Sequence, residues 1–150
     1  SALGADGSWS HAGKGLRMAI LRALRGSGLG AEDIDCVLAC ANSSRELDRM
    51  ETQAIKEALG GHALRIPVSA IKSMIGETYS ASGALAAAAA VGAVRRGAVP
   101  PTVNYGERDP ACDLDCVPNK ARRQRLRNVL VTASDPYGQN AALVVGSFEG

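Results

Sequence analysis

The stretch Lys72-Ser73-Met74-Ile75-Gly76-Glu77-Thr78-Tyr79-Ser80-Ala81-Ser82-Gly83-Ala84 decides how this chain folds. It runs directly into a segment, residues 80–94, in which almost every residue is small and apolar. A helix without a polar face is normally buried on all sides. This segment therefore predicts a central helix that packs closely against its neighbours.

Composition limits what the protein can be. The chain has 150 residues, of which 46% are hydrophobic and 21% charged, as expected for one globular domain spanning residues 1–150. A net charge of +2 is too small to indicate a nucleic-acid partner. No apolar run is long enough to cross a membrane, and no basic region followed by an apolar core opens the chain. We therefore expect a cytoplasmic protein.

Hydrophobic periodicity predicts a mixed α/β fold. Apolar residues recur at helical spacing in two segments, 11–25 and 46–59, and residues 80–94 are apolar around the full circumference of a third expected helix. Short apolar runs predict four strands, at 34–40, 66–69, 128–133 and 141–147. Helices alternate with strands early in the chain and two strands close it, which indicates a mixed sheet.

The four cysteines fall into two pairs, Cys36/Cys40 and Cys112/Cys116. Cys36 and Cys40 lie on one predicted strand, where a separation of four residues is roughly 13 Å. That distance cannot close a tetrahedral metal site. We therefore expect reduced thiols and no bound metal.

Two blocks of sequence resemble the C-terminal half of a β-ketoacyl synthase, the condensing enzyme of fatty-acid and polyketide assembly. The first runs Ile34-Asp35-Cys36-Val37-Leu38-Ala39-Cys40-Ala41-Asn42-Ser43-Ser44-Arg45-Glu46-Leu47-Asp48-Arg49-Met50-Glu51. In the family a catalytic His stands at the position of Cys40, and a Thr-rich turn that handles the carrier arm stands where this chain has residues 42–44. The family's scaffold acids match Asp48 and Glu51. The second block is the opening motif, which keeps Lys72 and Gly76 but has Glu77 at the second catalytic His.

Two further blocks extend the resemblance toward residue 150. Residues 109–119 read Asp-Pro-Ala-Cys-Asp-Leu-Asp-Cys-Val-Pro-Asn, close to the family pattern. The family's glycine-rich gate corresponds to residues 132–140, where only Gly138 and Asn140 are retained. The resemblance implies a thiolase-like C-terminal half-domain with a mixed sheet and a buried alanine-rich helix. It also implies that the nucleophilic Cys belongs to an N-terminal half that we do not expect within this chain.

The family's reaction depends on two His side chains that this chain replaces, and these replacements change the function that the resemblance implies. In the family the two His side chains donate hydrogen bonds to a developing oxyanion; a carboxylate at position 77 would repel that charge, and a thiol at position 40 is a weak donor. We expect Cys40, Lys72 and Glu77 to be vestigial site positions in a non-catalytic subunit of the chain-length-factor type. Such a subunit would act with a ketosynthase-like partner chain and an acyl carrier protein, whose phosphopantetheine arm carries the substrate; no other cofactor is expected.

Several alternatives stay open on sequence alone. The chain could be half of an active β-ketoacyl synthase or acyltransferase with an altered site, or a scaffold that binds a carrier protein. Cys40 fits a buried small side chain, and Glu77 fits a structural pair with Lys72. The basic run at residues 120–127 fits a solvated connection, or a docking patch for an acidic carrier protein.

Overall fold

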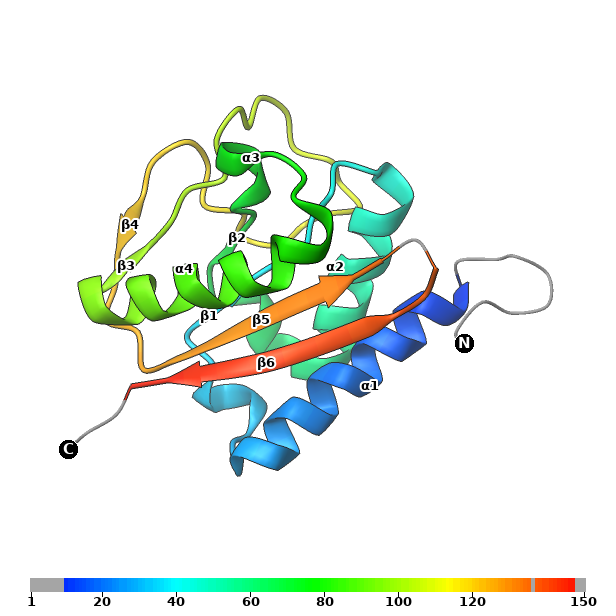
Figure 1. The fold of residues 1–150 in the computed structure, drawn as a ribbon, viewed down its shortest axis with the longest axis horizontal. Coiled ribbons are helices and arrows are strands. Elements are labelled where there is room, and N and C mark those ends of the chain that lie inside the picture. The colour runs from blue at the N-terminus through cyan, green and yellow to red at the C-terminus, as the bar shows by residue number, and fades with distance from the viewer. Residues whose placement is uncertain (1–9, 136, 148–150) are drawn as a thin grey trace.

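A computed structural model describes residues 10–135 and 137–147 of the chain. Its elements, in chain order, are α1 (Ser10–Ser27), η1 (Ala31–Asp33), β1 (Cys36–Leu38), α2 (Arg45–Leu59), η2 (Gly60–Leu64), β2 (Val68–Ser69), α3 (Lys72–Ile75), η3 (Tyr79–Ala81), α4 (Ser82–Arg96), β3 (Ala98–Val99), β4 (Arg122–Arg123), β5 (Asn128–Ser134) and β6 (Asn140–Gly146). Helices lie on both faces of a central sheet (Figure 1). The predicted α/β class is therefore confirmed.

The central sheet has the strand order β2-β1-β5-β6. Strand β1 pairs in parallel with both β2 and β5, whereas β5 and β6 form an antiparallel pair along their full lengths. A mixed sheet of this kind places the carboxyl ends of β1, β2 and β5 at one edge. The site residues follow these strand ends.

Two apolar cores lie on opposite faces of the sheet, because side chains alternate along each strand. On one face α1 and α2 pack against Val37 and Leu130. On the other face α4 packs its Ala86, Ala90 and Ala93 against Leu38, Val129 and Val131. Methyl-sized side chains let this helix lie close to the sheet.

Helix α4 is covered on one side only. It ends at Gly97, whose φ of 57° places it in the left-handed conformation that glycine adopts easily. Its outward residues are exposed, and Val91 retains 47% of its accessible surface. Within the described residues the sheet supplies one covering layer for α4, and the opposite side of the helix stays exposed.

Strands β1 and β2 are shorter than the sequence predicted, whereas β5 and β6 lie within one residue of their predicted bounds. Strand β1 begins at Cys36 rather than at residue 34. Asp35 instead uses its carboxylate to accept hydrogen bonds from the backbone N–H groups of Arg127 and Asn128, at 2.6 and 2.9 Å. Separately, none of the helices among residues 10–135 and 137–147 is both long and apolar enough to span a membrane.

Candidate functional site

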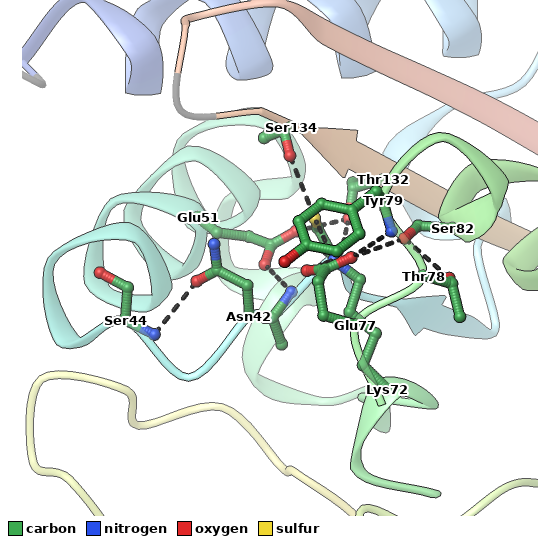
Figure 2. Close-up of polar contacts among 12 residues, drawn as sticks. Asn42, Ser44, Glu51, Lys72, Glu77, Thr78, Tyr79, Ser82, Thr132 and Ser134 are labelled. Atoms are coloured by element: carbon green, nitrogen blue, oxygen red, sulfur yellow. Dashed lines mark hydrogen bonds and ion pairs between the residues drawn. The ribbon is translucent and has the colours of Figure 1, made fainter. Parts of the chain in front are cut away.

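The fold brings Cys40, Lys72 and Glu77 together. Cys40 follows the end of β1, Lys72 opens α3 shortly after β2, and Glu77 precedes α4. Lys72 Nζ lies 3.4 Å from Cys40 Sγ and 2.8 Å from Glu77 Oε2 (Figure 2). The three positions singled out in the sequence thus form one cluster at the carboxyl edge of the sheet.

Glu51 fixes the loop that carries Cys40. Its side chain is buried, and its two oxygens accept hydrogen bonds from the backbone N–H groups of Cys40 and Ala41, at 2.9 and 2.8 Å. Thr132 on β5 adds its hydroxyl to the same carboxylate at 2.6 Å. A buried carboxylate is tolerated when donors surround it. Glu51 therefore ties the loop after β1 to the neighbouring strand.

The same loop adopts a backbone that suits glycine better than the residues it contains. Ala41 has a φ of 31° and Ser43 a φ of 66°. Both fall in the left-handed region, which is unfavourable for residues with a Cβ. In the β-ketoacyl synthase motif that this loop resembles, both positions are glycine. The loop therefore holds a backbone that glycine adopts easily, although neither position is glycine in this chain.

The Lys72–Glu77 ion pair makes Glu77 a fixed negative charge. Glu77 Oε1 also accepts hydrogen bonds from the Tyr79 backbone N–H at 2.8 Å and the Ser82 hydroxyl at 2.9 Å. The hydrogen bond from Lys72, together with these two donors, lowers the pKa of Glu77 to about 2. Burial opposes the charge on Lys72, but the hydrogen bond to Glu77 raises its pKa overall. Both groups are therefore charged at neutral pH.

Cys40 is held as a neutral thiol. Its Sγ donates to the carbonyl oxygen of Ser134 at 3.4 Å. Burial, and then the charge of Glu51, raises the pKa of Cys40 above its ordinary value, even though Lys72 is close. The thiolate is the nucleophilic form of cysteine. The arrangement therefore disfavours nucleophilic chemistry at this sulfur.

Asp48 is the second retained scaffold acid, and its environment is less favourable. Burial and the charge of Glu51 raise the pKa of Asp48 to about 6. Its Oδ1 is buried without a hydrogen-bond partner among the described residues. Asp48 therefore lies close to its protonation point near neutral pH.

A cleft of about 910 Å³ opens beside this cluster. It lies between α2, α3 and the segment 102–116, and its walls include Asn42, Ser43, Lys72 and Glu77. Its volume lies within the usual range for small-molecule sites. In the described part of the chain, no group of three or more His, Cys, Asp or Glu side chains is placed to hold a metal ion.

The basic run at 120–127 leads away from this cluster. Arg122 pairs with Asp115 through both carboxylate oxygens. The run then ends at the start of β5, which is the opposite edge of the sheet from Cys40 and Glu77. Because Arg122 is paired with Asp115 and the run lies at the far end of the sheet, residues 120–127 fit a structural connection better than a docking patch for a carrier protein.

Three residues of the site were not identified from the sequence. Tyr79 and Ser82 bond to Glu77, and Thr132 bonds to Glu51. The N-cap residue of α4 is Ala81, so a helix-capping signal does not identify Ser82. Thr132 lies within a predicted strand, and only the three-dimensional pairing of β1 with β5 reveals its partner.

Comparison with known families gives one family match. A sequence model described as the beta-ketoacyl synthase C-terminal domain matches residues 3–106. Nodulation protein E of Rhizobium sp. (strain N33) is 42% identical over 134 residues, which cover 89% of this chain and 33% of that protein. The tetracenomycin polyketide synthase ketoacyl synthase alpha subunit of Streptomyces glaucescens is 44% identical, over 89% of this chain and 31% of that protein. The chain thus spans about a third of the length of these curated relatives.

Solved structures give the same result for the fold. The ishigamide ketosynthase/chain length factor superposes with a TM-score of 0.87 at 35% identity, covering 91% of this chain and 34% of that one. A beta-ketoacyl synthase from Burkholderia phymatum STM815 gives 0.85 at 31% identity, covering 91% and 33%. A type II PKS acyl-carrier protein in complex with its ketosynthase gives 0.84 at 29% identity, covering 90% and 34%. The predicted thiolase-like C-terminal half-domain fold is confirmed.

Proposed function

The chain belongs to the β-ketoacyl synthase family, and from this premise we propose that it is a non-catalytic, ketosynthase-like subunit of the chain-length-factor type. In this role it assists a partner chain that condenses acyl and malonyl thioesters in polyketide assembly. That reaction joins the acyl carbon to the malonyl carbon, releases CO₂ and frees the thiol that held the acyl group. Residues 1–150 act in it as one ketosynthase C-terminal-like domain.

One observation carries this proposal: Glu77, which replaces the second catalytic His of the family motif, forms an ion pair with the retained Lys72. Condensation passes through an enolate, whose oxygen needs hydrogen-bond donors in the transition state. Glu77, with a pKa of about 2, is a carboxylate at neutral pH and repels such an oxygen. Loss of one oxyanion donor costs about a hundred- to a thousand-fold in rate in other enzymes.

The state of Cys40 argues against the alternative of an active synthase or acyltransferase with an altered site. That alternative needs a nucleophile. The Cys40 thiol, however, has a raised pKa and donates a hydrogen bond to the Ser134 carbonyl oxygen. Lys72 also donates a hydrogen bond to this sulfur and lowers its pKa, but burial and the charge of Glu51 outweigh that effect and keep the thiol protonated. A pure carrier-binding scaffold has no specific observation in its favour.

A ketosynthase-like chain is the partner that the surface best fits. The outer face of α4 presents apolar residues to solvent, with Leu85 and Val91 each more than two-fifths exposed. Contiguous exposed apolar surface of this kind marks an interaction site. The phosphopantetheine arm of an acyl carrier protein is the substrate carrier that this role requires, and the cleft beside Asn42 and Ser43 has room for a ligand of that size.

Reconstitution with a partner tests the proposal. The chain is assayed alone, and together with a ketosynthase chain that carries the nucleophile, using acyl- and malonyl-carrier protein as substrates. We expect no condensation by the chain alone, and condensation by the pair that depends on its presence. Turnover by the chain alone, or a partner whose products are identical with and without the chain, contradicts the proposal.

A further inference from the structure

The end of α4 and the ribbon formed by β3 and β4 make one basic surface. Helix α4 closes with two arginines in its last turn, and β3 follows directly after Gly97. Strand β3 pairs antiparallel with β4, so that Ala98 lies opposite Arg123. The Gln124 backbone N–H also donates to the Gly97 carbonyl oxygen at 3.0 Å, and Figure 1 shows the ribbon beside the end of the helix. The exposed arginines of this basic surface are Arg95, Arg96, Arg123 and Arg125.

The charge of the basic surface is not neutralised within the fold. None of its four arginines forms an ion pair among residues 10–135 and 137–147. The neighbouring Arg122 differs, because both carboxylate oxygens of Asp115 bind it. Exposure then alternates, with Arg123 and Arg125 exposed and Gln124 between them half-buried. Like charges held close together repel one another, so an anionic partner stabilises this arrangement.

The basic surface continues the apolar outer face of α4. Val91 and Arg95 are four residues apart in one helix and therefore lie on the same side of it. Both side chains are exposed, as is Leu85 nearer the start of the helix. A partner that covers the outer face of α4 consequently also reaches Arg95. An apolar centre with a charged rim is the usual composition of a protein–protein interface, and arginine is enriched there.

We propose that the basic surface docks an acidic patch of the ketosynthase-like partner chain and thereby fixes the orientation of that chain on α4. This inference rests on the proposed function, which supplies the partner. Arginine pairs with carboxylates through two parallel hydrogen bonds, so the groups that meet this surface are Asp and Glu side chains of the partner. Opposite charges at the rim of an interface speed up encounter and disfavour wrong orientations.

The position of the basic surface favours a partner chain over a carrier protein, which is also acidic. Glu77 precedes the start of α4, whereas the basic surface lies at the end of this 15-residue helix. At 1.5 Å per residue, the two ends are roughly 20 Å apart. The cleft beside Asn42 and Ser43 lies at the Glu77 end. A carrier protein docked on the basic surface would therefore hold its arm away from the cleft.

Association kinetics test the inference. The double variant Arg95→Glu/Arg123→Glu reverses two charges of the basic surface and leaves the apolar face of α4 intact. The matched control, Lys14→Glu/Arg22→Glu, makes the same change of charge at exposed positions of α1, on the other face of the sheet. Binding of each full chain to the ketosynthase partner is followed by surface plasmon resonance at about 50 mM and about 500 mM NaCl. We expect the first variant to associate about tenfold more slowly than wild type at low salt and about equally at high salt, and the control to stay within about twofold at both.

A second variant locates the contact without reversing a charge. Arg123→Lys keeps the positive charge and adds an amine that a carbodiimide can join to a carboxylate. In the complex we expect mass spectrometry to find a crosslink from position 123 to an Asp or Glu of the partner.

Equal association rates for the two double variants at low salt overturn the inference. A position 123 that is joined to no partner carboxylate, or only to a carrier protein, overturns it too. If Arg95→Glu/Arg123→Glu does not fold, as judged by circular dichroism, the crosslink alone decides. A wild-type chain that does not bind a ketosynthase chain at either salt concentration refutes the proposed function instead.

Discussion

The carboxylate of Glu77 lies 2.8 Å from the ammonium group of Lys72, at the place where the family has its second catalytic His. Only 12% of the Lys72 side chain is exposed, against 37% for Glu77. The pair is therefore shielded on one side and open on the other. It neutralises a largely buried lysine, and under the proposed function it leaves no oxyanion donor at position 77.

Replacing Glu77 should destabilise the protein in a pH-dependent way. The folded-state pKa of Glu77 is lowered to about 2, so its contribution is present above the ordinary value of 4.5 and is lost as pH falls through about 2. Because more than a third of the side chain is exposed, we expect Glu77→Gln to cost only about 1 kcal/mol at pH 7. Urea unfolding at a series of pH values measures this.

The exposed Arg17–Glu57 ion pair is a control for the Lys72–Glu77 pair. Glu57 lies 3.8 Å from Arg17, and both side chains are more than two-fifths exposed. Glu57→Gln should therefore change the free energy of unfolding by no more than a few tenths of a kcal/mol. An equal loss for Glu77→Gln at pH 2 and pH 7 contradicts the assignment.

Restoring glycine to the loop after β1 should stabilise it. Ala41 and Ser43 both have positive φ, which costs about 1–2 kcal/mol at a residue with a Cβ. Glycine removes that cost but loses about 0.4–1 kcal/mol to the greater freedom of the unfolded chain. We expect Ala41→Gly and Ser43→Gly each to raise the free energy of unfolding by roughly 0.5 kcal/mol.

The same substitution in a helix supplies the control. Ala58 lies within α2, where glycine costs about 1 kcal/mol relative to alanine. Thermal unfolding should thus show opposite signs for Ala58→Gly and Ala41→Gly. Destabilisation by both would mean that the loop is not strained.

The sequence predicted the helices and the family well, for a physical reason. Residues 46–59 show helical periodicity, residues 80–94 are small and apolar all round, and α2 and α4 lie within two residues of these bounds. The Lys72–Glu77 pair was also foreseen, because the two residues are close in sequence and opposite in charge. The positive φ values of Ala41, Ser43 and Tyr79 were not, because these residue types give no local signal for them.

Contacts between segments that are far apart in the sequence could not be predicted from the sequence either. Thr132 meets Glu51 across 81 positions of sequence, and the pairing of β1 with β5 brings them together. The start of β1 was predicted two residues too early, because Asp35 binds backbone N–H groups through its carboxylate.

Asp48 should make the protein more stable as pH falls from neutral. Its folded-state pKa is raised to about 6, so the folded protein binds a proton more tightly than the unfolded chain does. The stabilising effect is complete below the ordinary value of 3.8 and is lost as pH rises through about 6. Asp48→Asn should therefore stabilise the protein at pH 7, by on the order of 1 kcal/mol after allowance for solvent screening, and have less effect at pH 4. A larger gain at pH 4 than at pH 7 in urea unfolding contradicts this.

The exposed face of α4 should be required for assembly. Val91→Asp places an unpaired charge on that face and should abolish binding of the ketosynthase partner, because burial of a lone charge is costly. Ala87, on the same helix, is half-buried, so a charge there would disturb folding as well. Gln53→Asp, on the exposed side of α2, is the matched control. Light scattering should detect the complex with Gln53→Asp and not with Val91→Asp; a complex retained by both variants excludes this face from the interface.

The central claim, that this chain contributes no catalytic group to condensation, is tested most directly with Cys40→Ala in the assembled synthase. Cys40 is the one nucleophilic side chain in contact with Lys72 in the described part of the chain. The measurement is the rate of condensation by the complex, together with mass spectrometry for an acyl group on Cys40. The account predicts an unchanged rate and no acyl group on this residue. A rate lower by about a hundredfold or more, the usual effect of losing a catalytic group, or an acylated Cys40 would contradict it.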